Sequence, residues 1–249
     1  MWIDLPRPTV IAHRGDKTHA PENTLAAFKL AAEKGADAIE FDVKLSADGQ
    51  VIVLHDQTVD RTTNGKGNVS KLPFALLRDL DAGTWFSEQF RGETIPTLEE
   101  VFETVGKRLD MNIELTNYAT PSDDLVAKVV KLVKKHNVQD RTLFSSFFTR
   151  NLRKVRLFLP EVPRGLLTMP GLVGFWGRAF GWRGDYFALH PFMAEVNPGL
   201  IHRVHAAGKR IHVWTVNSTK DLKRMIHLGV DAIFTDDPML ALRMLGRGI

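Results

Sequence analysis

Short apolar runs alternate with amphipathic segments along most of the chain. The short runs are rich in β-branched side chains, which predicts strands. They cover residues 9–12, 38–45, 51–55, 111–116, 142–146, 164–168, 186–190, 210–216 and 232–235. Longer segments carry apolar residues at helical spacing, which predicts helices. These cover residues 22–34, 98–107, 122–137, 149–158, 198–207, 220–228 and 238–245.

The order of these elements predicts the fold class. Strands that mostly alternate with helices over 249 residues indicate an eight-stranded (β/α)8 TIM barrel, and a doubly wound open sheet is the alternative. Residues 56–95 show no regular periodicity, so we expect a small insertion there, after the third strand. Because no internal repeat or linker is found, residues 1–249 are expected to form one domain.

Polar side chains occupy one face of three predicted strands. Residues i and i+2 of a strand share a face, so Glu40 and Asp42 lie together, as do His212 and Trp214. Glu114 likewise lies on the face of its own strand opposite the apolar residues. In a barrel the apolar faces meet the outer helices. The polar faces therefore point inward, at the end of the barrel where active sites form.

Three inward carboxylates repel one another unless they are protonated or neutralised. A set of oxygen ligands suits Mg²⁺ or Ca²⁺ better than zinc, and the chain has no cysteine. The alternative is that these acids pair with inward cations such as Arg14 or Lys44.

Histidine and arginine supply further candidate chemistry. His13 and His55 end predicted strands, and histidine can exchange protons near neutral pH. The other seven histidines are expected on helices or loops, in contact with solvent. Arg14 suits phosphate oxygens, and its alternative is a rim salt bridge with Glu22 or Asp42. Glu22 itself can instead favour a helix N-terminus electrostatically.

Composition and charge exclude several classes of function. The net charge of +4 is far below that of a nucleic-acid-binding protein, so we expect no nucleic-acid partner. Without cysteine there is no disulfide framework and no thiolate chemistry. No dinucleotide or P-loop glycine motif follows a strand. Since no signal peptide or membrane span is recognised, we expect a cytoplasmic protein with possible peripheral membrane contact through residues 165–187.

The motifs together resemble the glycerophosphodiester phosphodiesterases over nearly the whole chain. They are HRG (13–15), PENT (21–24), EFD (40–42), LHD (54–56), DRTTNGKG (60–67), NIEL (112–115), VWTVN (213–217) and TDDP (235–238). The resemblance implies a barrel with a small insertion and hydrolysis of a glycerophosphodiester to glycerol 3-phosphate and an alcohol, through a cyclic phosphate. It leaves open which histidine is the first base.

The resemblance also implies roles for residues of this chain. It implies that His13 and His55 are the general acid/base pair. It implies that one divalent cation, Mg²⁺ or Ca²⁺, is bound by Glu40, Asp42 and Glu114. It also implies that the substrate is held by Arg14, Glu22 and Trp214. One position departs from the family pattern, because Thr116 stands where a lysine usually follows the NIEL glutamate. A cationic phosphate contact is therefore missing or supplied elsewhere.

Other functions stay open on the sequence alone. The aromatic, glycine-rich segment within residues 165–187 favours acyl chains of lysophospholipids if it overhangs the site, and is otherwise an ordinary lid or dimer contact. A chain with this fold can also be a non-catalytic domain that binds phosphate headgroups. An unrelated aldolase- or enolase-type barrel needs an inward lysine or a base over a carbon acid, and lysine candidates are poor. The oligomeric state is not indicated.

Overall fold

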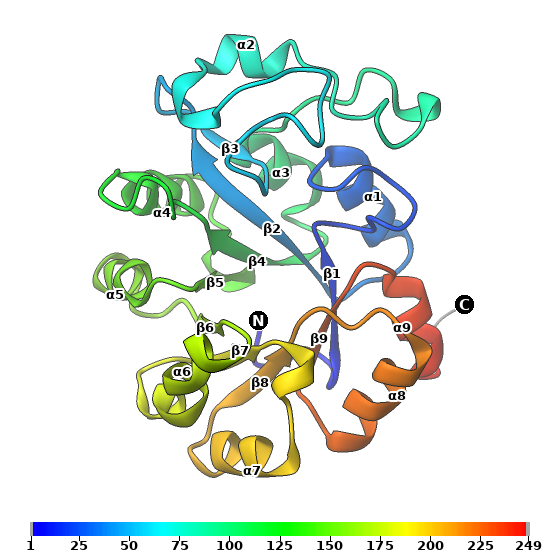
Figure 1. Ribbon diagram of the computed structural model, residues 1–249, viewed down its shortest axis with the longest axis vertical. Coiled ribbons are helices and arrows are strands. Elements are labelled where there is room, and N and C mark those ends of the chain that lie inside the picture. The colour runs from blue at the N-terminus through cyan, green and yellow to red at the C-terminus, as the bar shows by residue number, and fades with distance from the viewer. Residues whose placement is uncertain (1, 248–249) are drawn as a thin grey trace.

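Eight parallel strands form a closed barrel surrounded by helices in the computed structural model, which describes residues 2–247 (Figure 1). The barrel strands are β1 (Thr9–His13), β2 (Ala38–Leu45), β4 (Asp110–Leu115), β5 (Thr142–Ser146), β6 (Arg164–Thr168), β7 (Ala188–Pro191), β8 (Arg210–Val213) and β9 (Ala232–Thr235). Neighbours pair in chain order, and β1 pairs with both β2 and β9, which closes the ring. The predicted TIM barrel is confirmed.

The outer helices begin and end close to their predicted positions. They are α1 (Leu25–Glu33), α3 (Leu98–Val105), α4 (Leu125–Lys135), α5 (Thr149–Phe158), α6 (Phe175–Phe180), α7 (Pro198–Ala206), α8 (Thr219–Leu228) and α9 (Pro238–Met244). Local capping explains the boundaries. Thr97 and Glu100 form a capping box before α3, and the Thr24 side chain caps α1, which starts three residues later than predicted. The sequence pattern did not predict α6.

The predicted third strand is not a barrel strand. β3 (Val51–Val53) pairs with β2 in the antiparallel direction, because the link between them is a tight turn at Asp48–Gly49. Parallel neighbours need a much longer crossover. The insertion that follows contains η1 (Val69–Lys71), α2 (Phe74–Arg78) and η2 (Glu88–Phe90). It lies over β3 at one side of the barrel and has a small apolar core of its own (Figure 1).

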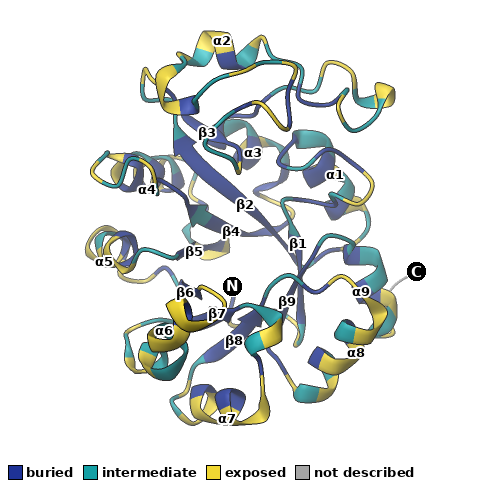
Figure 2. Ribbon diagram, viewed as in Figure 1, coloured by how far each residue is buried: buried dark blue, intermediate teal, exposed yellow. Residues whose placement is uncertain are grey.

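The core has two layers, as the alternation along the strands predicts. Outward side chains such as Phe41 and Ile113 pack against the helices, and the strands are buried throughout (Figure 2). Inward side chains fill the barrel, where Trp2, Ile11 and Phe234 belong to one apolar cluster. No helix within residues 2–247 is long and apolar enough to cross a membrane.

Two buried histidines contradict the expectation that every histidine other than His13 and His55 lies on a helix or loop. His190 on β7 and His212 on β8 are fully enclosed, with ring centroids 4.8 Å apart. Burial lowers the pKa of His190 to about 3, and it lowers the pKa of His212 well below its usual value. Both rings are therefore neutral packing groups of the barrel interior.

Candidate active site

The edge of β2 brings the two candidate proton-transfer residues together. β4 pairs with one edge of β2, and β1 and β3 share the other. β1 runs parallel to β2 and ends at His13, level with Glu40. β3 runs antiparallel, and the next residue, Leu54, donates its amide to the carbonyl of Asp42 at 3.0 Å. His13 and His55 thus approach the same stretch of β2 from opposite directions and line one pocket.

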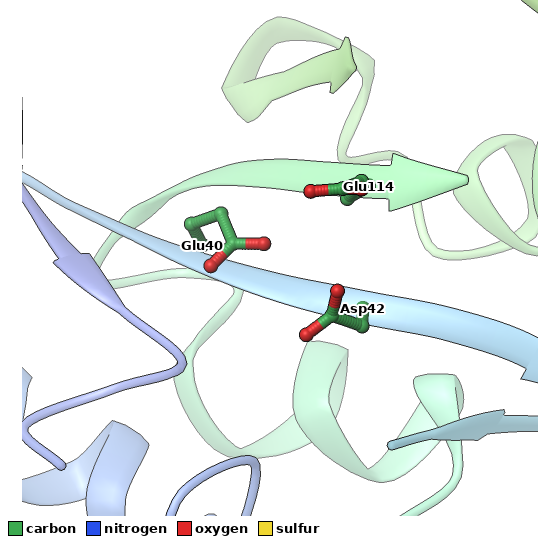
Figure 3. A group of neighbouring side chains, drawn as sticks. All are labelled: Glu40, Asp42 and Glu114. Carbon is green, nitrogen blue, oxygen red and sulfur yellow. The ribbon is translucent and has the colours of Figure 1, made fainter. Parts of the chain in front are cut away.

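Three carboxylates form a cluster beside these histidines. Glu40 and Asp42 come from β2, and Glu114 lies opposite Asp42 on β4. One oxygen of each lies within 4.8 Å of the others, and Figure 3 shows the oxygens turned toward the space between the two strands. Burial and the neighbouring carboxylates raise the pKa of Glu40 well above its usual value, and burial together with Asp42 raises that of Glu114 to about 8.

The charge of this cluster is only partly neutralised by protein groups. Arg14 Nε lies 3.5 Å from Asp42. Burial raises the pKa of Asp42, but Arg14 and the other neighbouring donors and cations together outweigh it, so this pKa is lowered. Within residues 2–247, no lysine or arginine side-chain nitrogen lies within 4 Å of a carboxylate oxygen of Glu40 or Glu114. Glu40 accepts a hydrogen bond from the backbone amide of Arg14 at 3.2 Å. The alternative of internal ion pairs therefore applies to one carboxylate of the three. A buried set of oxygen donors with uncompensated charge fits a hard divalent cation.

Each candidate histidine is held by an aspartate. His13 Nδ1 lies 2.7 Å from Asp236, and His55 Nδ1 lies 2.6 Å from Asp56. The pKa of Asp236 is lowered because its contact with His13 outweighs burial, and the hydrogen bond from Arg61 lowers that of Asp56. Both carboxylates are ionised and accept a hydrogen bond from Nδ1–H of the histidine, which leaves Nε2 of each ring available to a substrate.

Sequence reasoning missed these aspartates as functional residues. Both stood in quoted motifs, because Asp56 directly follows His55 in LHD and Asp236 lies in TDDP. Asp236 is distant from His13 in the sequence and becomes its neighbour only because β9 pairs with β1.

A charged network from the insertion connects the two halves of the site. Arg61 donates to both oxygens of Glu22, at 2.9 and 2.7 Å, and also to Asp56. Glu22 accepts from Arg14 Nη1 at 2.9 Å, and the two arginines outweigh burial and lower the pKa of Glu22 to about 2. The network therefore joins Arg14 to the aspartate that holds His55. Arg61 was also missed, although it lies in the motif DRTTNGKG.

Arg14 adopts an uncommon backbone conformation at the end of β1. Its φ is +58°, and its amide donates to the carbonyl of Glu40 at 2.9 Å. The next residue, Gly15, has φ +85° and packs so closely on Ala27 that a Cβ would lie 2.7 Å from the alanine Cβ. This turn places Arg14 in the pocket wall, whereas Glu22 is not among the residues that line the pocket and contacts Arg14 behind it. The helix explanation for Glu22 fails because α1 has no acidic residue in its first turn.

A buried lysine, Lys44, lies beside Thr116 but does not line the pocket. Its ammonium group donates to the carbonyls of Leu54 and His55, both at 2.7 Å, and to Thr116 Oγ1 at 3.1 Å. Lys44 follows Asp42 on the inner face of β2 and is almost fully buried. The positive charge beside position 116 therefore comes from β2 instead of β4, and it fastens the chain segment that carries His55.

Replacing Lys44 by methionine is expected to lower the free energy of unfolding by about 2 kcal/mol, because two buried carbonyls lose their donor. Chemical denaturation measures this change. Lys128→Met is the matched control, since Lys128 is part-exposed and donates to a single carbonyl at the surface, and its effect is expected to stay below about 0.5 kcal/mol. Equal effects of the two substitutions would show that the Lys44 contacts do not stabilise the site.

Aromatic residues form one wall of the pocket. Trp214 lines it and donates Nε1–H to the carbonyl of His190 at 2.8 Å. Phe147 and Phe192 pack against the indole at centroid distances of 5.8 and 5.4 Å. The predicted position of Trp214 at the pocket is therefore observed, and its orientation is fixed from three sides.

Comparison with known proteins agrees with this geometry. The sequence model of the Glycerophosphoryl diester phosphodiesterase family matches residues 13–240. A glycerophosphodiester phosphodiesterase of Caldanaerobacter subterraneus subsp. tengcongensis is 44% identical over 96% of this chain and 98% of its own length. A phosphodiesterase from Oleispira antarctica, solved in complex with the product sn-glycerol-3-phosphate, is 34% identical, with a TM-score of 0.90 over 98% of both chains. A glycerophosphodiester phosphodiesterase from Agrobacterium tumefaciens is 33% identical, with a TM-score of 0.79 over 94% of this chain and 99% of that one.

Proposed function

Because the chain belongs to the glycerophosphoryl diester phosphodiesterase family and is a phosphoric diester hydrolase, we propose that it releases glycerol 3-phosphate from glycerophosphodiesters by histidine acid–base catalysis with one divalent cation. One observation carries the proposal: His13, His55, Glu40 and Glu114 line the same pocket. The two histidines provide proton transfer, and the carboxylates provide a seat for a cation beside them.

The proposed reaction uses each histidine once in each half. One histidine takes the proton of the glycerol 2-hydroxyl as the oxygen of this hydroxyl bonds to phosphorus. The other histidine protonates the departing alcohol as the bond between phosphorus and the oxygen of that alcohol breaks. Water then opens the cyclic phosphate with the roles reversed. Burial, opposed by the bond to Asp236, lowers the pKa of His13, so this ring is neutral near pH 7 and can accept a proton.

Charge on the phosphate is stabilised from two directions. Arg14 lines the pocket and offers guanidinium donors to the non-bridging oxygens, and Glu22 orients it. A Mg²⁺ or Ca²⁺ ion held by Glu40, Asp42 and Glu114 supplies further positive charge for these oxygens when bound. Trp214 lines the same pocket and bounds the space for the substrate.

The competing functions fit the site less well. A domain that only binds phosphate headgroups has no use for two histidines that are each oriented by an ionised aspartate. A Schiff-base enzyme needs a free inward lysine, and Lys44 is held by two carbonyls and a hydroxyl. Both alternatives predict that no phosphodiester is hydrolysed.

Product identification tests the proposed reaction. With glycerophosphocholine the expected products are sn-glycerol 3-phosphate and choline, whereas phosphocholine and glycerol would place the cleavage at the wrong ester bond. The analogue 3-hydroxypropyl phosphocholine lacks only the 2-hydroxyl and is expected to be inert. Its hydrolysis at the rate of glycerophosphocholine would contradict the cyclic route and favour direct attack by water.

Cation affinity is expected to rise with pH. Without a cation, Glu114 keeps its proton up to about pH 8, and Glu40 also titrates above its usual value. A cation must displace these protons, so its binding releases them and becomes tighter as the pH rises from 6.5 to 8.5. Calorimetric titration with Ca²⁺ in buffers of different ionisation enthalpy measures the affinity for the cation and the number of protons released on binding. An affinity that is constant over this range, without proton release, would contradict the assignment of the ligands.

An exposed apolar surface favours lysophospholipids as a second candidate substrate class. In the segment after β6, Leu172 is 91% and Trp176 69% exposed, with Val173 and Phe175 beside them. Residues 169–184 contain two arginines and no acidic residue, which suits a lipid surface that carries phosphate groups. Because loops after barrel strands lie on the active-site face, acyl chains on this surface would hold a headgroup near the pocket.

Replacing Phe175 and Trp176 together by serine tests this second candidate. Both side chains are exposed, so the variant is expected to fold. If the surface holds acyl chains, hydrolysis of lysophosphatidylcholine falls while that of glycerophosphocholine is kept. Equal effects on both substrates would reject it, and a change from dimer to monomer in light scattering would instead make the surface a contact between two copies.

A further inference from the structure

A polar pair lies in the active-site pocket beside the carboxylates, because Asn112 is level with Glu40 and Ser145 is level with Glu114. Asn112 on β4 and Ser145 on β5 both line the pocket, and the asparagine amide donates to Ser145 Oγ at 2.8 Å. Glu114 is in turn level with Asp42. Since the pocket opens at the carboxyl ends of the strands, Asn112 lies one side-chain layer deeper than Glu114. We call Asn112 and Ser145 the pocket floor.

The floor has unused hydrogen-bonding capacity. Asn112 Oδ1 is buried with no partner, although the residue is only 1% exposed. In the part of the chain that the structure describes, no acceptor takes the Ser145 hydroxyl proton. Unpaired polar groups at such depth are costly, and a ligand or an ordered water that enters the pocket can complete them. The floor therefore offers one acceptor and one donor side by side.

A ligand hydroxyl group matches this pair, because it donates one hydrogen bond and accepts another. A phosphate oxygen does not, since it can only accept and the free oxygen of Asn112 would repel it. An apolar group would leave both capacities unused. Phe234 and Leu167 also line the pocket and offer no polar side-chain partner, whereas the neighbouring Glu40 and Glu114 belong to the proposed cation site.

We propose that the floor binds the primary hydroxyl of the glycerol moiety, so that Asn112 and Ser145 select diesters whose glycerol carries a free primary hydroxyl. This inference rests on the proposed function and deepens it. The 2-hydroxyl has to stay beside a histidine and the phosphorus, and the primary hydroxyl at the far end of glycerol is the group left to reach the floor. A 1-acyl lysophospholipid has an ester at that position, so it lacks the floor contacts and is expected to have a lower kcat/KM than glycerophosphocholine even where the apolar surface after β6 holds its acyl chain.

Two substrates that differ by one hydroxyl test the proposal in the wild-type protein. Glycerophosphocholine is compared with 2-hydroxypropyl phosphocholine, which keeps the secondary hydroxyl and lacks only the primary one. The expected kcat/KM is roughly 10- to 100-fold lower for the analogue, because two buried groups stay unpaired. Equal kcat/KM values would overturn the proposal and assign the floor to water.

The variant Asn112→Leu completes a cycle with these substrates. It is expected to reduce kcat/KM for glycerophosphocholine by a similar factor and to leave that for the analogue nearly unchanged. The Kd for Ca²⁺ is expected to stay at the wild-type value. Weaker Ca²⁺ binding in this variant would make Asn112 a cation ligand and overturn the proposal. Thermal unfolding shows whether the variant is folded. If it is not, the comparison of the two substrates in the wild-type protein decides the proposal.

Binding without turnover separates this inference from the proposed function. The cation-loaded wild-type protein is titrated calorimetrically with sn-glycerol 3-phosphate and with 2-hydroxypropyl phosphate. Tighter binding of glycerol 3-phosphate, by roughly 10-fold or more, supports the floor even if no diester is hydrolysed, in which case only the proposed function fails. Equal binding overturns the floor, whatever the activity.

Discussion

Replacing His13 by alanine is expected to lower kcat for glycerophosphocholine roughly 10²- to 10⁴-fold, because a positioned general acid or base contributes about this much. His55→Ala is expected to have an effect of the same order, since the reaction needs both a proton acceptor and a proton donor. Steady-state kinetics with excess Mg²⁺ or Ca²⁺ measure the loss. The effect should fall on kcat more than on KM, because the phosphate and glycerol contacts come from other residues.

His227→Ala provides the matched control. This histidine is exposed on α8, away from the residues that line the pocket, and its replacement is expected to leave kcat unchanged. Thermal unfolding of all three variants shows whether the fold is kept. Full activity of a folded His13→Ala or His55→Ala variant would remove that residue from the proton-transfer pair.

Glu114→Gln is expected to weaken cation binding and to lower kcat/KM roughly 10³-fold, because a lost cation removes several kcal/mol of stabilisation from the charged transition state. Glutamine keeps the size of the side chain, and its amide oxygen can still accept the hydrogen bond that Tyr118 donates to Glu114 at 2.9 Å. Calorimetry with Ca²⁺ and steady-state kinetics measure the two losses.

Tyr118→Phe separates the charge of Glu114 from its support. This variant keeps all three carboxylates and removes the one hydrogen bond that Tyr118 donates to Glu114, so its expected cost at the cation site is about 1 kcal/mol, roughly a fivefold loss of kcat/KM. The hydroxyl also accepts from the Phe147 amide at 3.1 Å, so thermal unfolding is measured in parallel. If Glu114→Gln and Tyr118→Phe reduced cation affinity equally, the position of the side chain would matter and its charge would not.

Local periodicity was sufficient to predict the parts of the site that lie on single strands. Glu40 and Asp42 alternate with apolar residues along β2, and Glu114 does the same on β4, so their inward direction follows from the pleat of a strand. The parallel register of β2 and β4 then places Asp42 opposite Glu114. A barrel predicted from the order of elements therefore already implied a carboxylate cluster.

Contacts between distant segments were beyond local reasoning. Asp236 meets His13 only because β9 closes the barrel against β1, and Arg61 meets Glu22 only because the insertion folds back over the rim. Lys44 was considered as a partner of the carboxylates, yet it turns to the carbonyls of Leu54 and His55. Its direction depends on β3 running antiparallel to β2, which the apolar pattern of β3 does not reveal.

The polar barrel interior was also underestimated. His190 and His212 alternate correctly for inward positions, and the pattern on β8 placed His212 inside. Solvent contact was nevertheless expected for them, because all histidines other than His13 and His55 were assigned to helices or loops. The two imidazoles stack on each other, His212 stacks on Trp2, and His190 packs at a tilted angle against Phe234, which makes neutral imidazoles acceptable in the core.

Hydrolysis of glycerophosphocholine by the metal-free protein, followed by addition of one divalent cation per chain, tests the central claim most directly. Release of sn-glycerol 3-phosphate is measured after chelation with EDTA and removal of the chelator, and again during titration with Mg²⁺ or Ca²⁺. Because the carboxylate cluster is expected to hold a cation that the reaction needs, we expect no release by the metal-free protein and full recovery at one ion per chain. Undiminished release by the metal-free protein, or no release with any ion, would contradict it.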